Sequence, residues 1–160
     1  MRRTMLMCLV IVMTLAPLAA HGEGIREERP NLVFGEIGGK AILFSAGYER
    51  YLTNQIGVGV GAVGWGAEDG GVGLFPIYAV LVPFGDMHSM YLSTGITYFA
   101  GYSNWDDDDD GDGWTEWVGT ISAGYTYQSD GGFFVRPTMN MLYKNDGFVV
   151  FPGIAVGGSF

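Results

Sequence analysis

The feature that most constrains this chain is an alternation of period two that recurs from about residue 40 to the C-terminus. In segment 55–62, QIGVGVGA, every second residue is apolar and the residues between are almost all glycine. A period of two belongs to a β-strand whose two faces meet different surroundings. No segment after residue 30 shows a sustained helical period, so we expect an all-β fold.

Turn signals rich in Gly, Asp and Asn divide the chain into long strands. The expected strands are 40–51, 56–66, 73–83, 89–102, 114–128, 133–144 and 147–160, with a shorter eighth at 31–38. Most exceed the five or six residues usual in soluble sheets. A tilted strand needs about nine to eleven residues to cross a bilayer, so the lengths favour a transmembrane barrel.

The two parities of these strands differ in composition. One parity is small or polar: Ser45, Gly47, Gly57, Gly59, Gly61, Ser93, Gly95, Thr97, Thr138, Asn140, Gly153, Ala155 and Gly157. The other is large and apolar: Ile42, Phe44, Val58, Val60, Leu92, Ile96, Met139, Met141, Ile154 and Val156. A soluble exterior would carry Lys, Glu and Arg, whereas small residues suit a narrow, crowded interior. The pattern predicts lipid outside and a filled lumen.

Aromatic residues gather near the strand ends. If the last strand ends in the periplasm, alternation sets the direction of all the others. The outer end then carries Trp65, Tyr102, Trp105, Trp114, Tyr143 and Phe148, and the inner end carries Tyr48, Tyr51, Phe84, Tyr91, Tyr125, Tyr127, Phe133 and Phe160. Two rings of aromatics at strand ends are typical of membrane-interface girdles.

The N-terminus has the layout of a secretory signal peptide. Arg2 and Arg3 precede an apolar run from Met5 to Leu15, and small residues follow up to Gly22. That run is too short to span a bilayer, so we expect cleavage and export of the chain. We divide it into a signal peptide at 1–22, a short N-terminal segment at 23–30 and an outer-membrane barrel at 31–160. Cys8 lies in the signal peptide, so the mature chain would have no disulfide.

The charge balance excludes one class of partner. The formal net charge is −9, and it becomes more negative once Arg2 and Arg3 are removed. Such a surface repels phosphates, so we expect no binding to nucleic acids.

At this level the chain resembles the small bacterial outer-membrane β-barrels of the OmpX and OmpA-barrel type. Phe160 resembles the C-terminal aromatic that barrel-assembly machinery recognises in that class, and segments 36–39 (EIGG) and 48–50 (YER) resemble the first strands of related barrels. The resemblance implies an eight-stranded antiparallel up-and-down transmembrane β-barrel in the bacterial outer membrane. It also implies contact with outer-membrane lipids and lipopolysaccharide, and we expect a monomer.

Four residues depart from that pattern. Gly158 stands where the terminal signal of the class usually has a hydrophobic residue, and Pro76, Pro137 and Pro152 fall within expected strands. Proline cannot donate to a strand ladder, so bulges or shorter strands are expected at those three points.

A run of aspartates is the most conspicuous candidate for metal binding. Asp106, Asp108, Asp110 and Asp112 lie in NWDDDDDGDGW, which begins like a calcium-binding loop. The bidentate Glu that such a loop needs twelve places on is absent, because Trp117 stands there. We expect a solvated surface loop between Trp105 and Trp114, with no firmly bound cofactor. A weak Ca²⁺ site, or cations bridging to lipopolysaccharide, is the secondary expectation.

Few charged residues fall on the small, polar parity. Glu49 and Arg136 are expected to meet across the lumen near the inner end, and Glu116 and Lys144 to pair near the outer rim. Because a buried charge needs a partner, we interpret both pairs as structural and as closing the lumen to water.

Catalysis has little support in the sequence. His21 lies at the cleavage site, and His88 lies beside Ser89 in a short turn without an orienting acid. We therefore expect an outer-membrane barrel with a structural, adhesion or surface-interaction role and not an enzyme. The alternatives are a soluble exported, lipocalin-like barrel that binds a small apolar ligand, and a lipid-modifying outer-membrane enzyme.

Overall fold

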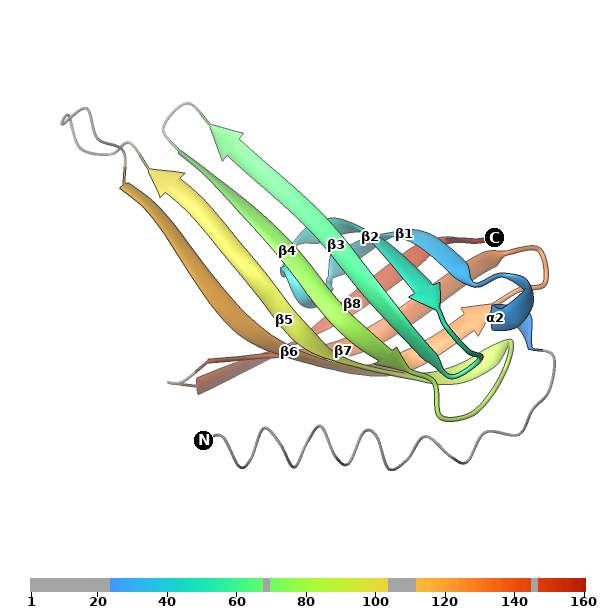
Figure 1. The fold of residues 1–160 in the computed structure, drawn as a ribbon. Helices are drawn as coiled ribbons and strands as arrows, with labels where there is room; N and C mark the ends of the chain where they lie inside the picture. The colour runs from blue at the N-terminus through green and yellow to red at the C-terminus, as the bar shows by residue number, and fades with distance from the viewer. Residues whose placement is uncertain (1–23, 68–69, 104–111, 145–146) are drawn as a thin grey trace.

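A computed structural model describes residues 24–67, 70–103, 112–144 and 147–160 (Figure 1). The elements are helix α2 (Ile25–Glu28), strand β1 (Asn31–Gly38), the 3-10 turn η2 (Gly39–Ala41), and strands β2 (Phe44–Tyr51), β3 (Ile56–Ala67), β4 (Gly70–Leu81), β5 (His88–Ser103), β6 (Asp112–Gln128), β7 (Phe133–Lys144) and β8 (Gly147–Ser159). No helix in these ranges is long and apolar enough to cross a membrane.

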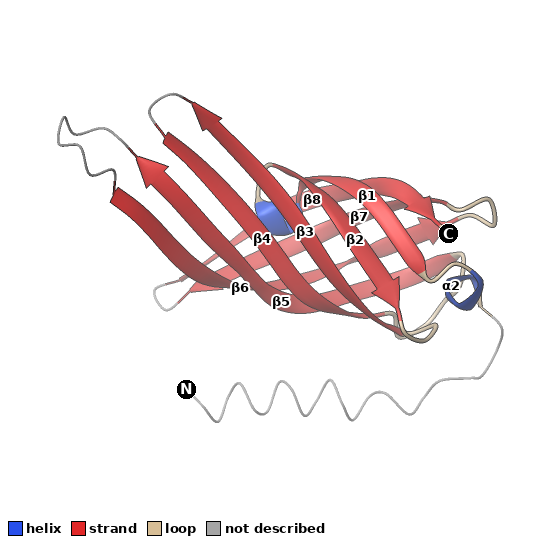
Figure 2. Cartoon of the chain, turned by 45° about the horizontal axis from the view of Figure 1, so that its top comes forward, coloured by secondary structure: helices blue, strands red, loops and turns tan. Residues whose placement is uncertain are grey.

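The strands form one closed sheet. Each strand pairs antiparallel with its sequence neighbours, and β8 pairs back to β1, as the ring of strands in Figures 1 and 2 shows. The predicted fold class, an eight-stranded antiparallel up-and-down barrel, is therefore confirmed. Most strand boundaries lie within two or three residues of the expected ones, because the turn signals and the alternation point to the same places.

The period-two pattern separates the inside of this barrel from its outside. On the small, polar parity, Ser45, Ser93, Thr97, Thr138 and Asn140 are buried in the lumen. On the other parity, Val58, Ile96 and Ile154 are 48%, 45% and 44% exposed on the outer surface. The prediction of a polar interior and an apolar exterior agrees with these positions.

Many of the glycines make room for aromatic rings. In five cross-strand pairs a glycine lies directly opposite an aromatic residue whose ring covers the place of the missing Cβ. These pairs are Phe34–Gly47, Gly59–Tyr78, Gly71–Tyr102, Gly101–Trp114 and Gly119–Tyr143. A ring laid over a cross-strand glycine covers backbone that would otherwise be bare and packs the wall without a side-chain clash.

The expected strand 40–51 is wrong at its start. Strand β2 begins at Phe44, because the chain leaves the sheet at Gly38 and Gly39, whose φ angles of 70° and 76° lie in the left-handed region. Turn η2 then folds into the barrel, where Lys40 and Ala41 are buried. Ile42, with φ of 72°, leads the chain back to the wall in a conformation that β-branched residues rarely adopt.

The three prolines are accommodated without bulges, so that expectation is corrected. The β3–β4 ladder omits the pairs beside Pro76, and the β6–β7 ladder omits those beside Pro137, but the register resumes unchanged beyond each gap. Each of these two prolines still pairs with the neighbouring strand on the opposite edge: Pro76 pairs with Thr97 on β5, and Pro137 pairs with Ile154 on β8. Pro152 pairs with Met139 of β7 and lies next to Gly153, where the β1–β8 ladder ends, so β8 also continues through its proline without a bulge.

Glycines that approach a neighbouring backbone should resist substitution. At Gly95 an added Cβ would run into the carbonyl oxygen of Ile77, whereas nothing lies within 4 Å of a Cβ at Gly35. We expect Gly95→Ala to lower the free energy of unfolding by about 1–3 kcal/mol through overpacking. The matched control Gly35→Ala should change it by less than about 0.5 kcal/mol. Urea titrations of the detergent-folded barrel would measure both, and equal losses would contradict the packing described here.

Candidate functional site

The lumen holds a buried ion pair near its inner end, which we call the central pair because it bridges the lumen from wall to wall. Arg136 on β7 donates from Nη1 to Oε1 of Glu49 on β2 at 2.7 Å and from Nη2 to Oε2 at 2.9 Å. Both side chains are fully enclosed, with 1% and 0% of their surface exposed. This two-pronged geometry is the strongest form of a carboxylate–guanidinium contact. The structure thus brings together the two residues that the sequence paired across the lumen.

Two tyrosines complete the shell around this carboxylate. Tyr78 on β4 and Tyr91 on β5 donate their hydroxyls to Oε1 of Glu49 at 3.0 and 3.1 Å. The guanidinium of Arg136 lies 3.9 Å from the centre of the Tyr91 ring, and its Nε donates to Oγ1 of Thr126 at 3.0 Å. Every charged atom of the pair therefore has a partner, which a buried charge requires.

A second layer of charge comes from η2. The ammonium of Lys40 lies 3.9 Å from Oε1 of Glu36 and 4.3 Å from the centre of the Tyr78 ring. The backbone of the same turn is fixed by Thr97, whose hydroxyl donates to the carbonyl of Lys40 at 3.1 Å. Lys40 thus places a second cation beside the Tyr78–Tyr91 shell and links η2 to the central pair.

Two clusters of buried apolar side chains pack beside these layers. One buried cluster comprises Leu32, Phe34, Tyr51, Tyr78, Val80, Val82, Tyr91, Phe134 and Ala155, and a second joins Ala41 of η2 to Val63 and Leu74. A hollow of about 330 Å³ lies instead at the outer ends of β3, β4 and β5, between Trp65 and Tyr102. An eight-stranded barrel is just wide enough for side chains to fill, and this one follows that rule.

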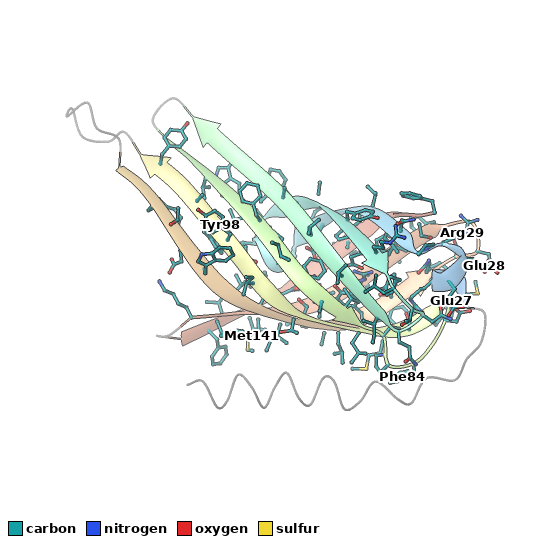
Figure 3. The ribbon with its side chains drawn as sticks, viewed as in Figure 1. Glu27, Glu28, Arg29, Phe84, Tyr98 and Met141 are labelled. Carbon is teal, nitrogen blue, oxygen red and sulfur yellow. The ribbon has the colours of Figure 1, made fainter. Side chains whose placement is uncertain are left out.

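At the opposite end of the lumen, α2 lies against the inner turns. Ile25 and Arg26 are 6% and 1% exposed, while Glu27 and Glu28 point outward (Figure 3). Burial lowers the pKa of the Arg26 guanidinium below its usual value, and the neighbouring Tyr51 and Asp86 oppose that shift. This arrangement could not be predicted from the sequence, because segment 23–30 has neither a clear period nor a motif.

The second predicted ion pair lies at the outer rim. Lys144 at the end of β7 contacts Glu116 on β6, and the two side chains are 52% and 33% exposed. Solvent screens a pair of this kind, so it contributes little to stability. That either pair closes the lumen to water stays a prediction.

The predicted girdle residues fall into three groups. Tyr48, Tyr102, Tyr125 and Tyr143 are between 37% and 51% exposed, and Tyr127 and Phe160 share their outward parity. Tyr51 and Tyr91 point into the lumen and are 4% and 0% exposed, so their placement in the inner girdle was wrong. Trp65 and Trp114 continue the lumen-facing parity at the far ends of β3 and β6.

An outward-facing row of rings had not been anticipated. The ring centroids of Tyr98 and Trp117 lie 4.6 Å apart, and those of Phe75 and Tyr98 lie 6.5 Å apart. Figure 3 shows Tyr98 on the outside of the wall. The alternation of β4, β5 and β6 identifies these residues, because Phe75, Tyr98 and Trp117 lie on the same outward parity as Ile77, Ile96 and Ile121.

The candidate metal ligands Asp106, Asp108 and Asp110, together with Trp105, lie outside the described residues, and Asp112 is the first residue of β6. Across the described ranges no group of three His, Cys, Asp or Glu side chains gathers in a metal-binding arrangement. The weak divalent site stays a prediction.

The adjacent His88 and Ser89 face opposite sides of the wall. His88 contacts the Tyr125 hydroxyl on the outer surface, whereas Ser89 is buried inside and accepts a hydrogen bond from Arg26. The two side chains therefore cannot act together as base and nucleophile.

Comparison with solved structures identifies the fold. The chain is similar to the N-terminal β-barrel domain of OprF from Pseudomonas aeruginosa, with 18% identity over 82% of this chain and 98% of that one, and a TM-score of 0.63. It is also similar to Ail, the attachment invasion locus protein of Yersinia pestis, with 16% identity over 81% of this chain and 93% of that one, and a TM-score of 0.49. No family model matches the chain, and neither does any curated protein sequence. The fold is that of the small eight-stranded outer-membrane barrels.

The central pair should be strongly coupled. Arg136→Met leaves the Glu49 carboxylate buried without its cation, so we expect the free energy of unfolding to fall by about 3–5 kcal/mol. The double variant Glu49→Gln/Arg136→Met should recover most of that loss, because no charge remains unpaired.

Urea titrations at pH 7, followed by tryptophan fluorescence, would measure this cycle. Lys144→Met, which breaks the exposed pair, is the matched control and should cost less than about 1 kcal/mol. If Arg136→Met costs no more than Lys144→Met, the central pair does not hold the lumen together.

Proposed function

We propose that this protein is an integral outer-membrane barrel with a closed lumen, which contributes to the structure of the membrane and to contacts at its surface. The observation that carries the proposal is the belt of exposed apolar side chains around the barrel. Val33, Ile37, Val58, Val60, Ile77, Ile96, Ile121, Met139, Ile154 and Val156 are all between 43% and 70% exposed. Water would meet a continuous apolar surface there, whereas lipid would bury it.

Outward-facing aromatics bound this belt on both sides. Toward the outer end lie Phe75, Tyr98, Trp117, Tyr143 and Phe148, and toward the inner end lie Phe84, Tyr125, Tyr127, Phe133 and Phe160. Beyond the outer row, the same face of β3, β4 and β5 carries Gly64, Gly66, Gly71, Gly73 and Ala100 in place of large aliphatic residues. The two rows of aromatics support membrane boundaries at their two levels. With these boundaries, the outer ends of β3–β6 extend beyond the lipid into the aqueous phase.

The filled lumen supports a structural role over general transport. Two layers of paired charge and two apolar clusters occupy the interior. Diffusion of solutes through a barrel requires a water-filled channel, which wider barrels provide. We therefore place surface contact, through the outer ends of β3–β6 and the acidic loop that joins β5 to β6, ahead of permeation.

We also propose which molecules this barrel contacts and how it reaches the outer membrane. The exposed belt fits outer-membrane lipids, and the acidic loop would meet lipopolysaccharide through bridging divalent cations. Phe160, 61% exposed beside the first residue of β1, would be accessible to barrel-assembly machinery after export through the periplasm. The belt has the same character all round, which suits a monomer surrounded by lipid.

Cell fractionation tests the location. The protein should sediment with the outer membrane and change its mobility on a detergent gel when it is boiled, because a folded barrel binds less detergent than an unfolded chain. Recovery in the soluble periplasmic fraction, without a shift on heating, would contradict the proposal and favour the lipocalin-like alternative.

Cysteine labelling tests which face meets lipid. Val58→Cys and Ile154→Cys should react poorly with a water-soluble thiol reagent in intact membranes, because both positions lie in the belt. Asp130→Cys, at an exposed position in the turn between β6 and β7, is the matched control and should react readily. Equal reaction at all three positions would mean that water reaches the apolar belt, which would contradict the proposal.

A further inference from the structure

The lumen-facing residues at the inner end of the barrel are more deeply buried than their position explains. Tyr51, Ser89, Gln128 and Ser159 lie at or next to the ends of β2, β5, β6 and β8, yet they are between 0% and 6% exposed. Residues at the rim of an open barrel would meet water. A further segment must therefore cover this mouth.

That segment is the short stretch that precedes β1. Figures 1 and 2 both place α2 at the end of the barrel that also holds the C-terminus. The backbone N–H of Ile25 donates to Oδ1 of Asp86 at 2.9 Å, in the turn between β4 and β5. Arg29 donates to the carbonyl of Ser159 at 3.3 Å, at the end of β8. The stretch thus spans the mouth from one side of the wall to the other.

Arg26 is the side chain that enters the mouth. Its guanidinium donates to the carbonyls of Gly85 at 3.2 Å and Asp86 at 2.9 Å, and also to the hydroxyl of Ser89. It lies 5.5 Å from the centre of the Tyr51 ring on β2. Among the described residues no carboxylate comes within salt-bridge distance of it. Its positive charge is stabilised by the two carbonyl oxygens and the Ser89 hydroxyl, and also by the nearby Tyr51 and Asp86. A lysine could not donate to these acceptors in the same geometry, because it lacks the planar two-pronged guanidinium.

We infer that residues 24–29 form an inner plug, a contact within the chain that closes the inner mouth in addition to the closure by the Glu49–Arg136 pair. The two closures act in series, because the plug contacts the rim whereas the ion pair lies deeper among Tyr78, Tyr91 and Phe134. The inference adds a second barrier to the proposed closed lumen, but it concerns the folded barrel whether or not that barrel lies in a membrane.

The contacts that hold the plug allow it to open while the barrel stays folded. Helix α2 has four residues, its Glu27 and Glu28 face solvent, and its hold on the rim depends on a few hydrogen bonds. Because this segment adds no strand to the barrel and only Gly24, Ile25 and Arg26 of it are buried, it opens at a much lower free energy than the barrel itself. Loss of the Arg26 contacts should therefore admit water and small solutes to the inner lumen without unfolding the wall.

Access to an introduced cysteine tests the plug. Gln128→Cys places a thiol at a position that is 0% exposed beneath the plug, in a chain whose natural cysteine lies in the expected signal peptide. A small charged methanethiosulfonate reagent is applied to the full-length exported protein, purified in detergent. The unsubstituted protein gives the background, and Asp130→Cys, an exposed position in the inner turn, gives the rate for an open site.

We expect Arg26→Ala to raise the labelling rate at Gln128→Cys at least about tenfold. Glu27→Ala, on the exposed side of the same helix, should leave that rate unchanged. Ser89→Ala, which removes one acceptor and leaves the N-terminal segment intact, should give a smaller increase. If Arg26→Ala shows no heat shift on a gel and therefore has not folded, the labelling rate measured with Ser89→Ala tests the plug in its place.

Equal labelling of Gln128→Cys with and without the Arg26 substitution, in variants that keep their heat shift, would overturn the inference. So would rapid labelling in the otherwise unsubstituted barrel. Neither result bears on the proposed location, because fractionation and the labelling of the outer belt test that separately.

Discussion

Closure of the sheet on itself is the constraint on which the rest of this structure depends. In a barrel each strand finds partners on both sides, so no long edge is left to be satisfied by lipid or by another chain. With eight strands the enclosed space is narrow. Gly47, Gly59 and Gly95 let rings and backbone approach closely, and Glu49 and Arg136 can be enclosed only as a fully bonded pair.

The wall that results is uneven. Strands β1 and β2 have 8 residues each, whereas β5 and β6 have 16 and 17. On the short side the chain turns inward at η2, which places Lys40 in the lumen and leaves Ile42, Leu43 and Phe44 exposed on the outside. On the long side the strands continue past the outer row of rings. Turn η2, on the side of the short strands β1 and β2, thus enters the lumen, whereas the long strands β5 and β6 extend past the outer row of aromatic rings.

The sequence predicted the parts of this structure that repeat. Alternation identified the strands and the sides of Val58 and Ser93, and scarcity of charge on the inner parity singled out Glu49 and Arg136. It could not predict η2, because Lys40, Ile42 and Phe44 share the parity of a continuing strand and only the left-handed turn at Gly38 and Gly39 breaks it. It could not predict the roles of Tyr78 and Arg26 either, since both depend on contacts between residues far apart in the chain.

The central claim is that this barrel has an apolar, lipid-facing exterior and a dry, polar lumen. The most direct test is nuclear magnetic resonance of the barrel in lipid nanodiscs with two paramagnetic agents, one dissolved in the lipid tails and one in water. The account predicts that the lipid-borne agent broadens the methyl signals of Val58, Ile96 and Ile154, while neither agent reaches Tyr91 or Thr97. Broadening of the three methyl groups by the water-borne agent would contradict the account and show that the two faces of the wall are reversed.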